Sequence, residues 1–196
     1  MLEHDWRREQ LLRIDEYDKV VEILCYSLKE NIDPKTLIED ARRTCDPVIV
    51  QLFDAETVAG KRHLFFGTLN AIKKFIQGRG LSQSLDIEIL LCVSAQKQIG
   101  EAIRINGIQR LTKKIAVVLV ANSVESALNA AQKLESLIPG AQDQTLLTKM
   151  DDKKRDYLIK SYGISSSEFE SLPEISSEEA LEWLIVERTA ILEVKR

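Results

Sequence analysis

Apolar residues follow two kinds of pattern along the chain. Nearly continuous apolar runs, typical of buried strands, occur at residues 20–28, 47–53, 86–94 and 115–121. Apolar residues at helical spacing occur at residues 36–44, 61–77, 96–106, 124–137, 151–162 and 176 to about 194. Helices alternate with strands early and dominate the C-terminal third. We therefore expect an α/β (α+β) fold in which a mixed sheet of about four strands is wrapped by helices.

Capping residues support these helix boundaries. Asp33 and Ser123 have the side chains preferred at helix N-caps, and Ser176 begins a capping box. The segments 141–148 and 165–177 match neither pattern, and we expect them to be flexible or extended connections.

The N-terminal segment is set apart from the rest of the chain. Residues 1–16 are an expected N-terminal extension, in which Trp6, Leu11 and Leu12 suggest a docking helix. Residues 17–196 are predicted to form a single domain. No apolar stretch reaches the ~18 to 20 residues that cross a bilayer, and the charged start MLEHDWRREQ is no secretory signal. We expect a cytoplasmic protein that does not associate with a membrane.

Charge is distributed unevenly along the chain. The net charge is −4, yet the segment from Thr57 to Val124 holds ten Lys or Arg and three acidic residues. This segment carries +7 and the remainder −11. A local anionic partner is therefore compatible with the acidic total, unless the middle of the chain pairs with its ends in the fold.

Few residues offer catalytic chemistry. The histidines are His4 and His63, and GxSxG, HExxH and phosphate-binding-loop motifs are absent from the sequence. We expect no catalytic residue, no metal site and no cofactor. One enzymatic alternative is a hydrolase in which His63 works with Asp54 or Glu56.

The helix over 61–77 has a second stripe opposite its apolar one. The predicted buried stripe comprises Phe65, Leu69, Ile72 and Ile76. The predicted polar stripe comprises His63, Gly67, Asn70 and Lys74, with Lys73 beside it. A glycine inside a helix costs ~1 kcal/mol relative to alanine, so Gly67 suggests that another group approaches the backbone closely there.

A second polar segment, SAQKQIGEAIRINGIQ, follows the run at 86–94. Its helix is expected to turn Ile99, Ala102 and Ile103 inward. Gln96 and Gln98 could bind base edges or ribose and Lys97 a phosphate, although glutamines are also ordinary at a helix start.

The last helix is apolar on two sides. One face contains leucines and an isoleucine, and the other comprises Trp183, Val186, Ala190 and Val194. Such a helix is either enclosed by its own core or offers a face to a partner protein, and the second face is our candidate partner surface.

Three blocks of the chain, in order, resemble one known family. They are VIVQLFDAETVAGKRHLFFGTLNAIKKF, DIEILLCVSAQKQIGEAIRINGI and VERTAILEV. They resemble the small kinase-binding, tRNA-binding subunit of the KEOPS complex, the family of the p53-related-protein-kinase-binding protein. The chain departs from the family pattern in having Gly67 for alanine, Ala95 for glycine and Lys97 for arginine. Alanine tolerates a positive φ poorly, and lysine lacks the planar fork of arginine.

The resemblance implies a role in making threonylcarbamoyl-adenosine in tRNA. Members bind and stimulate the kinase-like ATPase subunit, archaeal members also bind the CCA 3′ end of tRNA, and the chemistry belongs to other subunits, including the threonylcarbamoyl transferase. The fold implied is a small sheet wrapped by helices. The predicted RNA-binding residues are Lys61, His63, Asn70, Lys73, Lys74, Gln96, Lys97 and Gln98. The alternative is a protein-interaction regulator of the kinase-like subunit with no direct RNA contact.

Overall fold

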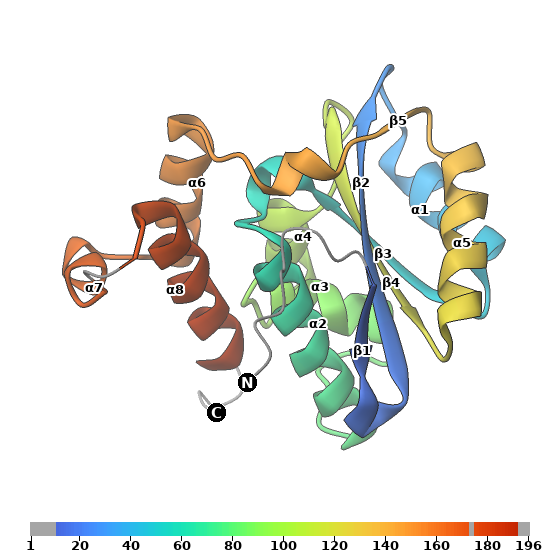
Figure 1. Ribbon diagram of the computed structural model, residues 1–196, viewed down its shortest axis with the longest axis horizontal. Helices are drawn as coiled ribbons and strands as arrows, with labels where there is room; N and C mark the ends of the chain where they lie inside the picture. The colour runs from blue at the N-terminus through green and yellow to red at the C-terminus, as the bar shows by residue number, and fades with distance from the viewer. Residues whose placement is uncertain (1–10, 173–174, 192–196) are drawn as a thin grey trace. The chain divides into compact units, whose positions relative to one another are not determined.

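The computed structural model describes residues 11–172 and 175–191. The chain has the predicted α+β fold, and it divides into two compact units (Figure 1). The first unit contains the chain up to Ala55 together with Gly107–Leu146. The second contains Glu56–Asn106 and the chain from Leu147 onward.

The first unit is built on a sheet whose described pairings are all antiparallel. Its strands are β1 (Leu11–Ile14), β2 (Lys19–Leu28), β3 (Ile49–Asp54), β4 (Lys114–Ala121) and β5 (Gly140–Gln142). The order is β1-β2-β4-β3, and β5 pairs with β2. The sheet is thus antiparallel and five-stranded, where we expected about four strands in a mixed sheet. Because β4 lies between β2 and β3 and is antiparallel to both, β2 and β3 share one direction without touching.

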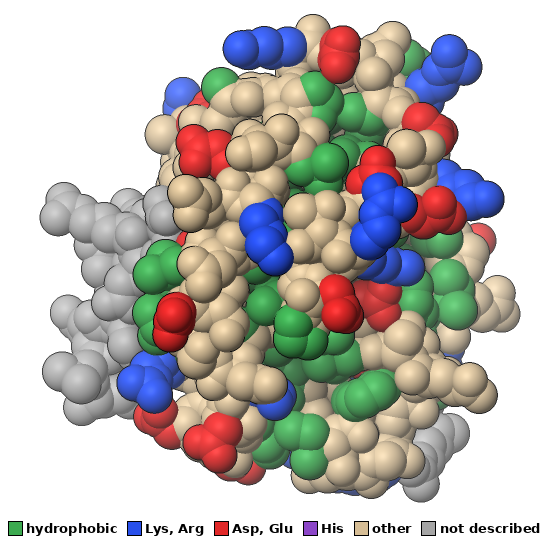
Figure 2. Space-filling view, turned by 90° about the vertical axis from the view of Figure 1, so that its right-hand side faces the viewer, with side chains coloured by type: hydrophobic (Ala, Val, Ile, Leu, Met, Phe, Trp, Pro, Cys, Tyr) green, Lys and Arg blue, Asp and Glu red, His purple; other side chains and the backbone are tan. Residues whose placement is uncertain are grey.

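Two helices cover one face of this sheet. They are α1 (Pro34–Cys45) and α5 (Val124–Leu137), which lie side by side on that face in Figure 1. Alternate strand residues such as Leu24 and Val117 pack there against Leu37 and Leu134. The predicted N-caps are confirmed, because the side chain of Asp33 accepts the Thr36 N–H and that of Ser123 accepts the Ser126 N–H. On the side of the unit seen in Figure 2, basic and acidic side chains are interspersed.

The second unit is helical. Its helices are α2 (Lys61–Ile76), α3 (Leu85–Val93), α4 (Ile99–Asn106), α6 (Asp152–Tyr162), α7 (Ser166–Glu170) and α8 (Ser177–Ile191). Helix α2 packs against α3 and α8, α3 against α4, and α6 and α7 against α8. Of the short 3-10 helices, η1 (Asp15–Tyr17) belongs to the first unit, whereas η2 (Ala55–Thr57) and η3 (Gln144–Leu147) each span a point where the chain passes from one unit to the other. None of the helices in the described ranges is both long and apolar enough to span a bilayer.

The structure corrects several predicted elements. The run at 86–94 is helix α3 rather than a strand, and residues Ile89–Val93 are buried on every side, which removes the helical periodicity from its sequence. Leu11 and Leu12 lie in β1 instead of a docking helix, and Trp6 lies outside the described residues. The two expected connections contain β5, η3 and α7.

Candidate nucleic-acid interface

The turn from α3 to α4 adopts a Schellman motif. The Gln96 N–H donates to the Leu91 carbonyl (3.0 Å) and the Ala95 N–H to the Cys92 carbonyl (3.1 Å). Ala95 occupies the left-handed position with φ +52°. The position where the family pattern has glycine therefore does require a positive φ, and this chain fills it with alanine.

This turn forms one wall of a surface pocket of about 500 Å³ within the second unit. The residues lining it come from the α3–α4 turn, the start of α4, the end of α6 and the end of α8, namely Ala95, Gln96, Lys97, Gln98, Glu101, Ser161, Tyr162, Arg188 and Ile191. Lys97 and Gln98 are exposed and Gln96 is half-buried. Three of the eight predicted RNA-binding residues thus line one cavity, together with α6 and α8 residues that sequence reasoning did not assign.

A buried hydrogen-bond network lies behind this pocket. The Tyr162 hydroxyl donates to Asn106 Oδ1 (2.9 Å) and lies 3.2 Å from the Val93 carbonyl oxygen and 3.3 Å from His63 Nε2. Asn106 Nδ2 in turn donates to the Thr57 carbonyl at 2.6 Å. Burial raises the pKa of the Tyr162 hydroxyl far above its ordinary value, so this group stays protonated and can donate. The network joins the residue that ends α3 to α2, α4 and α6.

His63 belongs to the network and is completely buried. Its Nδ1 accepts the Ala59 N–H (3.2 Å), which places the ring proton on Nε2, and Nε2 then donates to the Val93 carbonyl oxygen at 2.7 Å. Burial lowers the pKa of His63 to about 4, so the ring is neutral at physiological pH. A neutral, enclosed ring with both nitrogens engaged is unsuited to the hydrolase alternative and does not reach the surface to touch RNA.

Two more of the predicted RNA-binding residues on α2, and the glycine of its predicted polar stripe, also contact the interior of the unit. Lys61 is buried, and Asn70 is half-buried and donates to Thr189 Oγ1 of α8 at 3.3 Å. A Cβ on Gly67 would lie 2.6 Å from Val93 Cγ2 and 2.9 Å from Val93 Cα. Gly67 does mark a close approach, but the approaching group is helix α3.

Lys74 has a buried role as well. Only 4% of this residue is exposed, and its ammonium group lies 3.8 Å from the sulfur of Cys92. Glu88 is buried next to Cys92, and one of its carboxylate oxygens accepts the N–H groups of Leu81 and Ser82 (2.7 and 2.8 Å). Burial raises the pKa of Cys92 to about 12 despite the nearby ammonium, so this thiol is unreactive. Of the predicted RNA-binding residues on α2, Lys73 is half-buried and reaches the surface.

Helix α4 presents an apolar side to solvent. Ala102 is buried as predicted, but Ile99 and Ile103 are 46% and 43% exposed, so their predicted inward orientation was wrong.

The basic segment from Thr57 to Val124 does not lie in one unit, because Arg110, Lys113 and Lys114 belong to the first unit. The ten basic residues of this segment are therefore divided between the two units.

The apolar face of α8 predicted to meet a partner is partly exposed. Trp183 is 38% exposed, Ala190 is exposed, Val186 is half-buried, and Val194 lies outside the described residues. The Trp183 ring carries the Arg62 guanidinium 5.2 Å from its centroid.

Helix α8 also caps the start of α2. One Glu182 carboxylate oxygen accepts the Arg62 N–H at 3.0 Å, and a Cβ on Gly60 would lie 2.2 Å from the same oxygen. This carboxylate faces the positive end of the α2 dipole, where backbone N–H groups lack helical partners.

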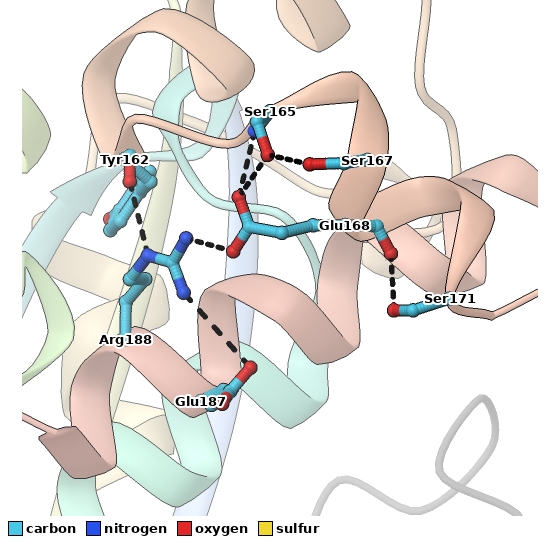
Figure 3. Close-up of polar contacts among 7 residues, drawn as sticks. All are labelled: Tyr162, Ser165, Ser167, Glu168, Ser171, Glu187 and Arg188. Atoms are coloured by element: carbon cyan, nitrogen blue, oxygen red, sulfur yellow. Dashed lines mark hydrogen bonds and ion pairs between the residues drawn. The ribbon is translucent and has the colours of Figure 1, made fainter.

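Arg188 of α8 lies beside the pocket and is fixed by several contacts (Figure 3). Its Nη2 forms an ion pair with Glu168 of α7, and its Nε donates to the Tyr162 carbonyl oxygen at 3.4 Å. Glu168 also closes the capping box of α7, because its other oxygen accepts the N–H and the hydroxyl of Ser165, each at 2.8 Å. The Arg188 guanidinium is the main reason why the pKa of Glu168 falls to about 2.

Comparison with known proteins identifies the family of this chain. The family described as "Kinase binding protein CGI-121" matches residues 28–193. One similar curated protein is the "Regulatory protein Cgi121" of Methanocaldococcus jannaschii, which is 33% identical over 105 residues. The alignment covers 54% of this chain and 64% of that relative, so the chain matches slightly less than two thirds of the relative's length.

Proposed function

Because the chain belongs to the CGI-121 family of kinase-binding proteins, we propose that it is a non-catalytic subunit of the KEOPS complex. In this role it binds and stimulates the kinase-like ATPase subunit. It also binds tRNA, including the CCA 3′ end, and so supports formation of threonylcarbamoyl-adenosine by the transferase subunit.

The single observation that carries the RNA-binding part is the pocket beside the α3–α4 turn. Single-stranded RNA is usually held by side chains that bind base edges and by cations that bind phosphate. Gln96, Lys97 and Gln98 bring amides and an ammonium group to the same wall. Lys73, also exposed in part, extends the proposed contact outside the pocket, whereas Lys61, His63 and Lys74 serve the interior of the unit.

Support for the kinase-binding part comes from the family description and from α8. Trp183 and Ala190 place apolar surface in solvent, and large aromatic side chains of this kind are frequent anchors of protein interfaces. We propose that Trp183, Val186 and Ala190, with Val194 beyond the described residues, contact the kinase-like subunit.

Lys97→Glu tests the RNA-binding part directly. Lys97 is exposed, so the substitution should leave the fold intact while placing a negative charge in the pocket. We expect affinity for tRNA to fall about tenfold or more, and the loss to shrink when the CCA end is removed. Lys113→Glu is the matched control, because it makes the same charge change at an exposed lysine of the first unit. Equal losses for both variants, or no loss for Lys97→Glu, would contradict the proposed pocket.

A second candidate is a regulator of the kinase-like subunit that does not touch RNA. The enclosure of Lys61, His63 and Lys74 favours it, because it removes three predicted contacts, and the net charge of −4 agrees. A pull-down with the kinase-like subunit and a gel shift with purified tRNA separate the two functions. Retention of the kinase-like subunit without any tRNA shift would select this second candidate.

A further inference from the structure

Arg188 is a basic residue of the pocket to which the proposed function assigns no role. It reaches the cavity from α8, whereas Lys97 lies on the α3–α4 turn. The cavity also contains Glu101, whose carboxylate lies 2.8 Å from Arg104 Nε and is therefore partly neutralised. Lys97 and Arg188 thus bring two cations to this pocket, and Arg188 is itself paired with Glu168.

We propose that Arg188 is the phosphate-binding residue of this pocket and that Glu168 positions its guanidinium. The inference rests on the proposed tRNA binding and names the group that holds the backbone of the single-stranded RNA. It assigns a binding role to α8 in addition to the proposed partner face around Trp183.

The geometry of Arg188 suits this task. A guanidinium has five N–H donors, and here the carboxylate of Glu168 takes Nη2 while Nε points to the Tyr162 carbonyl. Nη1 lies 4.0 Å from the Glu187 carboxylate, which is beyond hydrogen-bond distance (Figure 3). Among the described residues nothing accepts a hydrogen bond from Nη1, so its N–H groups can donate to a phosphate, and a planar fork held on one side binds phosphate with defined direction.

Glu168 is suited to act through Arg188 instead of competing with the ligand. One of its oxygens is committed to the Ser165 cap of α7, so the carboxylate is fixed before it meets Arg188. The neighbouring residues Phe169 and Leu172 pack into the apolar cluster of this unit and anchor α7. Glu168 therefore holds the guanidinium from the side of α7, and loss of its charge should loosen Arg188.

The test uses Glu168→Gln and Glu187→Gln, which remove the same charge near the same arginine. A pure charge effect predicts that both variants bind a CCA-ended tRNA more tightly, because each makes the pocket more positive. Positioning by Glu168 predicts that Glu168→Gln binds several-fold more weakly while Glu187→Gln binds equally or slightly more tightly. Arg188→Ala should bind about tenfold more weakly and reduce the slope of log affinity against log salt by about one. Arg188→Lys should keep that slope and recover part of the affinity.

Each result is decisive when thermal melting is recorded for every variant. If Arg188→Ala is unfolded, Arg188→Lys and Glu168→Gln carry the test, since both retain polar side chains of similar size. Wild-type affinity and salt slope in folded Arg188 variants, with binding lost in Lys97→Glu, would overturn this inference and leave the proposed function standing. Tighter binding by Glu168→Gln would overturn the positioning role. Absence of tRNA binding by the wild-type chain would overturn the proposed function, and this inference with it.

Discussion

A buried carboxyl group in the sheet predicts how the stability of this protein depends on pH. Glu22 lies on β2, opposite Leu11 of β1 and Leu119 of β4, and is only 3% exposed. Its Oε2 atom has no hydrogen-bond partner in the described part of the chain. Burial raises its pKa from 4.5 to about 7, because the charged form loses its water in the folded protein.

The direction of the effect follows from proton binding. Between pH 4.5 and about 7 the folded protein keeps a proton on Glu22 that the unfolded chain has released. The free energy of unfolding therefore falls as pH rises through this window, and this contribution becomes constant above the folded pKa. At 1.36 kcal/mol for each pH unit, the loss amounts to at most about 3 kcal/mol. That is a large share of the ~5 to 15 kcal/mol typical of a folded domain.

Urea unfolding from pH 5 to pH 8.5, for the wild-type chain and for Glu22→Gln, measures this loss. Glutamine is nearly isosteric with glutamate and cannot ionise. The free energy of unfolding of Glu22→Gln, relative to that of the wild-type chain, should therefore rise by about 2 to 3 kcal/mol between the two pH values. Asp15→Asn is the control, since Asp15 is an exposed carboxylate next to β1, and its difference from wild type should not grow in this way. Parallel pH profiles for wild type and Glu22→Gln would refute the reasoning, because they would mean that the folded protein holds ionised Glu22 without penalty.

Two further pairs of variants test backbone geometry, each by urea unfolding. Ala95→Gly should stabilise the protein by ~0.5 to 1 kcal/mol, because glycine relieves the left-handed strain at φ +52° but adds freedom to the unfolded chain. Gly163→Ala makes the reverse change at φ +60° with open space around it and should destabilise the protein by about 1 kcal/mol. Changes of the same sign in the free energy of unfolding of both variants would contradict this account. Gly67→Ala should destabilise by about 1 to 3 kcal/mol, because its Cβ would meet the backbone of Val93. Gly100→Ala, on the open side of α4, should instead stabilise the protein by up to about 1 kcal/mol. An unchanged free energy of unfolding for Gly67→Ala would contradict this account, because it would mean that α3 moves away from α2 at little cost.

The sequence was most informative where apolar residues face one environment. The runs that became β2, β3 and β4 are rich in valine and isoleucine and lie in the sheet as predicted. The run that became α3 is almost as continuously apolar but is enclosed by α2, α4 and α8, so neither period shows in its residues. The short strands β1 and β5 depend on pairing with β2, which local patterns do not encode.

The candidate site was predictable only in part, for a related reason. The α3–α4 turn could be identified from its polar residues, and the φ at Ala95 from the glycine in the family pattern. His63 has the spacing of an exposed residue on α2, yet its partners Val93 and Tyr162 lie 30 and 99 positions away in the chain. Arg188 likewise joins Lys97 in the pocket through the packing of α8, and that packing is a property of the folded unit.

The Glu182 cap on α2 has a consequence for how the protein is made. The second unit takes its two segments from either side of Gly107–Leu146, so the ribosome completes α2 well before it reaches α8. Until Glu182 emerges, the Arg62 N–H lacks its acceptor and the α2 face that receives α8 stays open. During synthesis this helical unit must therefore wait for its C-terminal segment, and a nascent chain halted before α8 offers an uncapped α2 to chaperones and proteases.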